Sequence, residues 1–394
     1  MIKDIRLIHF KSFEDSGVLT LSRVNLFTGK NGRGKSSVMQ SLLLLAQSFD
    51  KDRGISSLEL NGPFVSLGSF DDLNRRDGKS TSFSISFKTD DEIDSDITCE
   101  LVQDADDSRK AKIKDLSVDG VSKMETVAST SVITTEDGGP VLLENDGLAL
   151  GETSEKQVGA TSDIVGFSQF QSVTFISADR KGGVDYVKSD VAWNKEKGVG
   201  IHGEYVMNML EVASADQRAE INRLFRIVLD GGTVVTEPNE ERKEIYMYID
   251  PAGSDNGFKP SNVGFGYSYI LSILVSIVMS NNGSKLFVEN PEAHLHPSAQ
   301  AKLIEVMVEM ARQKDIQLFI ESHSDHVLHG LQIAVKDEKI GRDDLSVFFF
   351  SFKEGESNLS DVRQLEITPS GHIRRPPIGF CDQAEMDLSK LIGL

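Results

Sequence analysis

The chain has 394 residues, enough for one large domain or two to three ordinary ones, and 39% of them are hydrophobic, which allows a sizeable core. Its formal net charge of −19 repels nucleic acid at long range, so DNA contact would need a local basic patch or a partner. Two cysteines are too few for a disulfide framework, and no apolar run reaches the ~20 residues of a membrane span, so we expect a cytoplasmic protein with no membrane partner.

The N-terminal part of the chain predicts strands and a buried helix, followed by a β-rich insertion. Residues 2–10 and 18–27 have strand character, the run from Val38 to Ala46 is apolar on most faces of a helix, and residues 62–72 predict a turn, a short strand and an acidic loop. Between residues 80 and 172 the period changes to two, which predicts an antiparallel β lobe.

The C-terminal part predicts alternating strands and helices. A strand at 172–180 is followed by an amphipathic helical region (203–229) and by two further strands. A very apolar helix then starts near Gly266, and strands follow at 285–288, 316–320 and 346–352, with a short helix from Asp382 at the end. We expect a single domain over 1–394, with the β-rich insertion at 80–172 and a helical lobe at 200–282.

The most specific motif is a glycine, four residues, then Gly-Lys-Ser. It lies between a predicted strand and a predicted helix, as a phosphate-binding loop requires. Glycines let the backbone wrap a phosphate chain, Lys35 would reach the β- and γ-phosphates, and the Ser36 hydroxyl would bind Mg²⁺. The predicted nucleotide-binding residues of this loop are Gly29, Asn31, Gly32, Gly34, Lys35, Ser36 and Ser37.

Two later strands each end in polar residues. The apolar run at 285–288 ends in Glu289, which fits a Walker B acid that orients Mg²⁺. The strand at 316–320 delivers His323 to the same kind of edge, where it could donate to the γ-phosphate or simply cap the next helix. His323, His326 and His329 drift around a helix and show no closed zinc geometry, so a histidine metal site is the weaker hypothesis.

Taken together, these motifs resemble the ABC-type ATPase heads of the SMC and OLD class, which includes many bacterial phage-defence ATPases. The resemblance covers nearly the whole chain. It rests on the phosphate loop and on Ile8–Phe13, Leu67–Asp72, Ser177–Arg180, Asn262–Gly266, Glu289–Pro297 and Glu321–Ser324.

The resemblance implies an α/β P-loop NTPase fold with an antiparallel β lobe and a helical signature lobe. It also implies a homodimer with two ATP molecules at the interface, in which Asn262, Gly264 and Gly266 would contact the γ-phosphate held by the opposite subunit. The residue after the Walker B acid, normally a catalytic glutamate, is Asn290, which cannot accept a proton, so Glu292 is a possible substitute base and slow turnover is expected.

Two further departures concern the signature and the glutamine loop. The signature lacks the usual Leu-Ser-Gly-Gly-Gln, and no glutamine lies between Gln47 and Gln103, so Asp71 or Asp72 could stand near the metal instead. About forty residues follow the last predicted core strand, too few for the Toprim nuclease domain that OLD proteins carry, and no heptads predict a coiled coil.

The predicted function is an ATP-dependent dimeric switch, with ATP and Mg²⁺ as cofactors, that controls a separate effector such as a nuclease, plausibly in anti-phage defence. One alternative is a scaffold that ATP holds together without hydrolysis. Another is a repair ATPase that binds DNA ends, for which a basic face would come from Arg75, Arg76, Arg109, Lys110, Lys112 and Lys114.

Overall fold

The computed structural model of the chain describes residues 1–49, 55, 57–75, 80–90, 95–122, 125–127, 130–134, 140–144, 147–150, 167–189, 193–253, 257–353, 356–377, 380 and 390–391. The chain divides into two compact units. Unit 1 contains Met1–Ser22, Gly29–Val173 and Phe350–Gln364, and unit 2 contains Arg23–Thr28, Thr174–Phe349 and Leu365–Leu394. Arg76 and the start of the helix expected from Asp382 lie outside the described residues.

Unit 1 is built on an antiparallel sheet with the strand order β2-β1-β5-β6-β7-β4, and β8 pairs with β7. Its strands are β1 (Ile2–Ile8), β2 (Leu19–Thr20), β4 (Ser57–Glu59), β5 (Ser82–Thr89), β6 (Ser95–Gln103), β7 (Lys110–Val118) and β8 (Val121–Ser122). In β5 the side chains of Phe83, Ile85 and Phe87 are buried and their neighbours are not, which is the two-residue period expected from the sequence.

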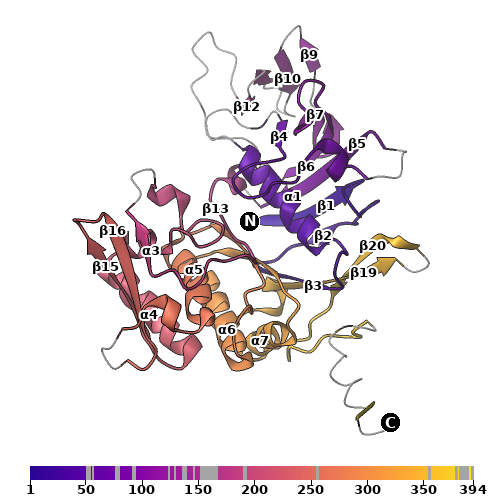
Figure 1. Cartoon of the computed structure of the whole chain (residues 1–394). Helices are drawn as coiled ribbons and strands as arrows, with labels where there is room; N and C mark the ends of the chain where they lie inside the picture. The colour runs from indigo at the N-terminus through magenta and orange to yellow at the C-terminus, as the bar shows by residue number, and fades with distance from the viewer. Residues whose placement is uncertain are drawn as a thin grey trace. The chain divides into compact units, whose positions relative to one another are not determined.

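A second antiparallel sheet of unit 1 has the order β12-β11-β10-β9. Its strands are β9 (Glu125–Val127), β10 (Thr130–Thr134), β11 (Pro140–Glu144) and β12 (Gly147–Leu150). Both antiparallel sheets contain strands of the 80–172 segment (Figure 1), so the expected antiparallel β lobe is confirmed.

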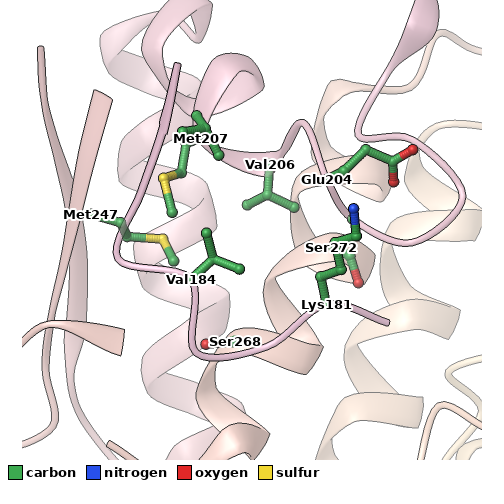
Figure 2. A pocket seen from close by; sticks show the side chains of 10 residues that line it. Lys181, Val184, Glu204, Val206, Met207, Met247, Ser268 and Ser272 are labelled. Carbon is green, nitrogen blue, oxygen red and sulfur yellow. The ribbon is translucent and has the colours of Figure 1, made fainter. Parts of the chain in front are cut away.

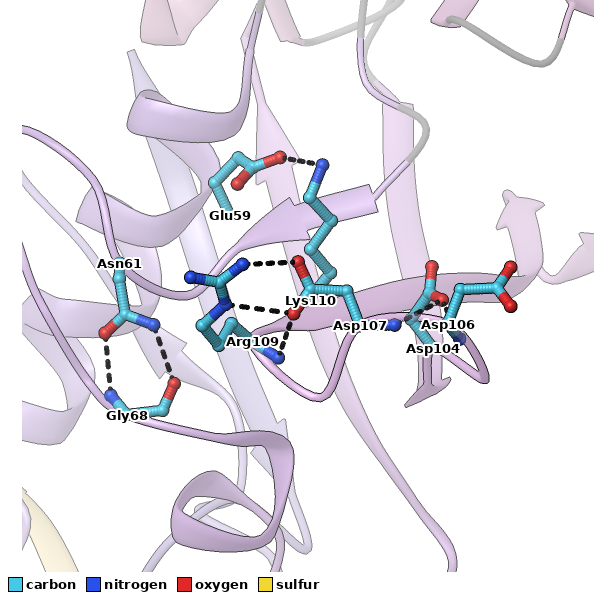
Figure 3. A network of polar contacts seen from close by, with 8 residues as sticks. All are labelled: Glu59, Asn61, Gly68, Asp104, Asp106, Asp107, Arg109 and Lys110. Carbon is cyan, nitrogen blue, oxygen red and sulfur yellow. Dashed lines mark hydrogen bonds and ion pairs between the residues drawn. The ribbon is translucent and has the colours of Figure 1, made fainter.

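Helix α1 (Lys35–Ser48) of unit 1 is buried on most faces, and its Gln47 amide organises the segment that follows. Gln47 donates to the carbonyls of Glu59 (2.5 Å) and Val65 (3.2 Å) and accepts from the N–H of Val65 (3.0 Å). The side chain of Asn61 then binds both the N–H and the carbonyl of Gly68, at 2.9 and 2.7 Å (Figure 3).

The acidic end of this segment differs from the sequence-based expectation. The short strand expected within 62–72 is only an isolated bridge between Asn61 and Ser66, and the predicted acidic loop contains helix α2 (Phe70–Leu73). The Asp72 carboxylate accepts from the N–H and hydroxyl of Ser69, at 3.0 and 2.8 Å, and so closes a capping box.

In unit 2 the central strands follow the order β13-β17-β18-β3-β19. They are β3 (Val24–Gly29), β13 (Val173–Ile176), β17 (Lys285–Glu289), β18 (Gln317–Glu321) and β19 (Leu345–Lys353). β17, β18 and β3 are parallel, with Glu289 opposite Glu321 and Glu321 opposite Phe27. Nearly all their side chains are buried, as continuous apolar runs in a parallel sheet require.

Helices cover these strands and supply most of the core of unit 2. They are α3 (Val206–Val212), α4 (Ala215–Leu229), α5 (Phe265–Met279), α6 (Pro297–Gln313) and α7 (Asp325–Lys336). Short 3-10 turns are η1 (Phe167–Phe170, in unit 1), η2 (Lys195–Lys197), η3 (Pro260–Asn262) and η4 (Arg342–Asp344). A small sheet of order β14-β16-β15 packs beside α3 and α4 (Figure 1).

The strands of that small sheet are β14 (Tyr186–Lys188), β15 (Thr233–Asn239) and β16 (Glu244–Asp250). Strand β20 (Glu356–Leu365) follows β19. The sequence analysis missed this strand because its residues are largely polar and show no clear alternation. No helix in the described part of the chain is both long and apolar enough to span a membrane.

Candidate functional site

The predicted phosphate loop starts where β3 ends and finishes where α1 begins. Gly29, Gly32 and Gly34 have φ values of +123°, +69° and +94°, a region that glycine adopts without strain. The loop is also tightly packed in unit 1: a Cβ at Gly29 would lie 2.3 Å from the carbonyl oxygen of Phe350, and one at Gly34 would lie 2.4 Å from the ring of Phe13.

Lys35 is 3% exposed, and its ammonium is held inside the loop. Its Nζ donates to the carbonyls of Gly29 (3.1 Å) and Lys30 (2.8 Å). The guanidinium of Arg33 lies over the ring of Phe352, 3.3 Å from its centroid. The loop is therefore a turn whose two ends are joined by Lys35, because its ammonium binds the carbonyls at the start of the loop.

The N-terminus of α1 fits an anionic ligand. Its N-cap, Gly34, has no side chain to accept from the first-turn N–H groups, and no acidic residue occupies the first turn. Helices α4, α6 and α7 are instead capped by the side chains of Ser214, His296 and Ser324. Ser36, the predicted Mg²⁺ ligand of this loop, lies in the uncapped first turn with Ser37 behind it.

In unit 2 the parallel strands bring their carboxyl ends to one edge of the sheet. Glu289 ends β17, Glu321 ends β18, and the N–H of Ser322 donates to the carbonyl of Phe27 near the end of β3 (3.1 Å). The predicted Walker B acid, Glu289, thus lies at the same edge as the end of β3, the strand that leads into the phosphate loop, with β18 between β17 and β3. That Glu289 and Ser36 share one Mg²⁺ stays a prediction, because they belong to different units.

The carboxylate of Glu289 is held by the segment after β13. The N–H of Ala178 donates to its Oε2 at 3.1 Å. Burial raises the pKa of Glu289 above its usual value, and the Ala178 bond and the positive charge of Arg180 partly offset this. A bound cation would favour the ionised form in the same way, so this oxygen ligand fits Mg²⁺.

Asn290 has a left-handed backbone, with φ of +45°. Its N–H donates to the carbonyl of Glu321 (2.8 Å), and its own carbonyl accepts from the N–H of Ala293 (3.1 Å) and from Arg180. Asparagine tolerates this conformation better than glutamate does. The structure thus gives a backbone reason for asparagine at the position where a catalytic glutamate was expected.

Glu292 and His323 are brought together by the turn that follows. The backbone N–H of His323 donates to Glu292 Oε1 at 3.2 Å, and Glu292 Oε2 is buried without a hydrogen-bond partner in the part of the chain that the structure describes. Ser324, not His323, caps α7, through its bond to the N–H of His326 (3.1 Å). The capping interpretation of His323 is therefore wrong, and His323 is an exposed residue whose backbone contacts the candidate base.

The signature segment begins α5. Asn262 ends η3, Gly264 is the N-cap of α5, and Gly266 lies in its first turn. This N-terminus, like that of α1, has no side-chain cap and no acidic first-turn residue. A Cβ at Gly266 would lie 2.6 Å from the carbonyl oxygen of His294, so the close approach of α5 to the turn after β17 requires glycine there.

A cavity of about 220 Å³ lies in unit 2 beside the loop that follows Arg180 (Figure 2). Its walls are largely apolar, from Val184, Val206, Met207 and Met247, with the hydroxyl of Ser268 at one end. None of the predicted site residues lines it. The sequence analysis gave Arg180, the residue before this loop, no role of its own, yet the structure buries it. Its place at the end of a predicted strand was the sequence feature that could have marked it as a candidate site residue.

Comparisons with known proteins agree with this architecture. A family model described as an AAA domain matches residues 4–228, and one described as an AAA ATPase domain matches residues 200–328. No curated protein was found to match the chain.

Among solved structures, an SMC head bound to the C-winged helix domain of ScpA is similar, with 12% identity, a TM-score of 0.50, and coverage of 93% of this chain and 97% of that one. An SMC head domain from Thermotoga maritima has 13% identity and a TM-score of 0.46, covering 93% of this chain and 99% of that one. The first match shows that the fold is that of an ABC-type ATPase head. Since the family model described as an AAA domain matches more than half of this chain, the chain belongs to the AAA domain family.

Proposed function

We propose that the chain binds Mg·ATP at the phosphate loop and hydrolyses it slowly. The observation that carries this proposal is the loop itself, with its left-handed glycines, its buried Lys35 and the glycine-capped N-terminus of α1. The match to an AAA ATPase domain supports it. Ser36 and Glu289 would hold Mg²⁺, which neutralises charge on the phosphates, while Glu292 would accept the proton of the attacking water.

The second part of the proposal is that two copies of the chain form an ATP-dependent dimer. The uncapped α5 N-terminus supports it, because Gly264 and Gly266 leave backbone N–H groups there without a side-chain acceptor. Asn262 would flank the same phosphate. In this arrangement, loss of the γ-phosphate, sensed by His323, would open the dimer.

We further propose that this dimer is a switch for a separate effector, such as a nuclease in anti-phage defence. This part rests on the resemblance to the SMC and OLD class, and a solved SMC head bound to a domain of ScpA supports the general idea of a protein partner. Co-purification with the product of a neighbouring nuclease gene, with and without ATP, tests it directly.

A second candidate function is an ATP-held clamp without turnover. Asn290 favours it, because an amide can orient a water molecule but cannot take its proton. The DNA-end alternative has less support: Arg109 pairs with Asp107 (3.1 Å) and Lys110 with Glu59 (2.8 Å), so two members of the basic face are already neutralised (Figure 3).

The deciding experiment measures phosphate release and dimerisation of the purified chain with Mg·ATP, with and without duplex DNA. Lys35→Met should abolish ATP binding, and Glu292→Gln should retain binding and dimers while turnover falls at least tenfold. Absence of ATP binding in the wild-type chain would refute the proposal. Binding and dimers without turnover, in wild type and Glu292→Gln alike, would favour the clamp.

A further inference from the structure

Arg180 is a buried cation that the proposed chemistry has not yet used. Its side chain lies in the segment after β13, and the residue is 3% exposed. One guanidinium nitrogen, Nη2, donates to the carbonyl of Asn290, while Nε and Nη1 have no hydrogen-bond partner among the described residues. A guanidinium buried this deeply is costly unless nearby groups compensate it.

The compensation comes from the groups around the turn after β17. The guanidinium carbon of Arg180 lies 5.3 Å from the centroid of the Tyr269 ring, on α5, and the charges of Glu292 and Glu289 also stabilise the cation. Burial still dominates and lowers the pKa of Arg180 to about 10, so the side chain is charged at neutral pH.

The bond to Asn290 acts on a residue with a left-handed backbone. Asn290 is left-handed and stands directly between Glu289 and the turn that carries Glu292. Its carbonyl is shared between the guanidinium of Arg180 and the N–H of Ala293. Arg180 therefore helps to hold the backbone conformation of Asn290, which sets the direction of the chain from Glu289 to Glu292.

The same segment contacts the first acid. Ala178, two residues before Arg180, donates its N–H to Glu289 Oε2, at 3.1 Å. The negative charge of Glu292 acts on the same guanidinium, and it is the largest of the charge effects that favour the Arg180 cation. The segment 177–180 thus contacts Glu289 through a hydrogen bond and interacts with Glu292 through the charge of Arg180.

We propose that Arg180 is a positioning residue for ATP hydrolysis, which holds the Asn290 turn and thereby places Glu292 relative to Glu289. The inference rests on the proposed function for its catalytic consequence, and on the structure alone for the contact. Arg180 itself does not touch the nucleotide in this scheme. Its removal should therefore change turnover and leave nucleotide affinity intact.

The kinetic test compares kcat and KM for ATP in Arg180→Ala, Arg180→Lys and wild type. We expect Arg180→Ala to lower kcat about 10- to 100-fold, as small misplacements of catalytic groups do, with KM within about twofold. Arg180→Lys should fall in between, because an ammonium can replace one donor only. Millimolar methylguanidinium should raise kcat of Arg180→Ala and not that of wild type. An unchanged kcat, or a raised KM with unchanged kcat, would overturn the proposal.

Arg218 offers a matched control. Its guanidinium also donates to backbone carbonyls, those of Ala213 (3.1 Å) and Glu211 (2.6 Å), but between α3 and α4. Arg218→Ala should leave kcat unchanged. If Arg180→Ala does not fold, Arg180→Lys and its kcat still decide the question.

A second measurement separates this inference from the proposed function. Hydrogen exchange of the amides in 290–294 should be at least tenfold faster in Arg180→Lys than in wild type, and unchanged in Arg218→Ala. This readout needs no turnover, so a wild-type chain without ATPase activity would refute the proposed function and still leave the contact tested. Unchanged exchange in Arg180→Lys would overturn the inference.

Discussion

The two glycines of the signature segment should respond to substitution in opposite ways. In Gly266→Ala the new Cβ would lie 2.6 Å from the carbonyl oxygen of His294 and 3.2 Å from Leu295, about 0.8 Å short of the 3.4 Å at which ordinary contact begins. Both neighbours belong to the turn after β17, and the nearest atom is backbone, which cannot rotate away. Helix α5 or this turn must therefore shift.

The magnitude follows from two opposing effects. Overpacking of this kind costs about 1–3 kcal/mol, while alanine favours the helix over glycine by about 0.5–1 kcal/mol. The net loss should be about 1–2 kcal/mol in the free energy of unfolding. For a unit of this size the corresponding drop in Tm is about 2–8 °C.

The control is Gly264→Ser. Apart from its chain neighbours, the nearest described atom to a Cβ at Gly264 belongs to the Tyr267 ring, at 3.9 Å. The φ of −61° suits any residue, and serine is a favoured N-cap. Thermal melts followed by circular dichroism should show a Tm equal to or above that of wild type. If Gly266→Ala melts with wild type, the packing argument is wrong.

Three further changes test separate parts of the structure. Lys314→Met should lower the free energy of unfolding by about 1–2 kcal/mol, because the Lys314 ammonium binds three carbonyls at the end of α5, among them that of Ser280 at 2.8 Å. Urea unfolding measures this, and equal unfolding midpoints for wild type and variant would contradict it. Burial lowers the pKa of Lys11 from 10.5 to about 8, so the folded chain binds fewer protons than the unfolded chain between these pH values. The stability of wild type relative to Lys11→Met should therefore increase as the pH rises from 8 to 10.5. A constant difference in stability would contradict this prediction. Asn290→Glu should lower the stability by about 1 kcal/mol because of the left-handed backbone, whereas Asn290→Gly should not, and identical melts for both would refute the reasoning.

Much of the fold could be predicted because its signals are local. Apolar runs of the parallel strands, the two-residue period of β5 and the helical region before the signature all appear at the expected places. The strand β20 was missed because its polar residues carry no alternating pattern. The strand expected after Gly62 failed for another reason: the amide of Gln47 and the capping box of α2 satisfy that backbone in place of a ladder.

The candidate site was predictable in composition and not in geometry. The motif around Lys35 predicts which residues would bind a phosphate, but not that the lysine binds the carbonyls of its own loop. Asn290 was interpreted from its side chain as a departure from a catalytic glutamate, and only the backbone angle reveals why asparagine suits the position. The role inferred for Arg180 depends on contacts across 110 positions of sequence, which no local pattern reports.

The internal bonds of Lys35 have a consequence for inhibitor chemistry. The ammonium donates to two carbonyls of its own loop, so a ligand that recruits the lysine must replace these bonds, and its affinity reflects the difference between the bonds lost and the bonds formed. A compact neutral compound would not displace the bonds between Lys35 and the loop carbonyls, so the lysine would add little to its binding free energy. A multiply charged acceptor can recruit the cation, so selectivity at this loop should increase with the ligand's negative charge more steeply than with its size.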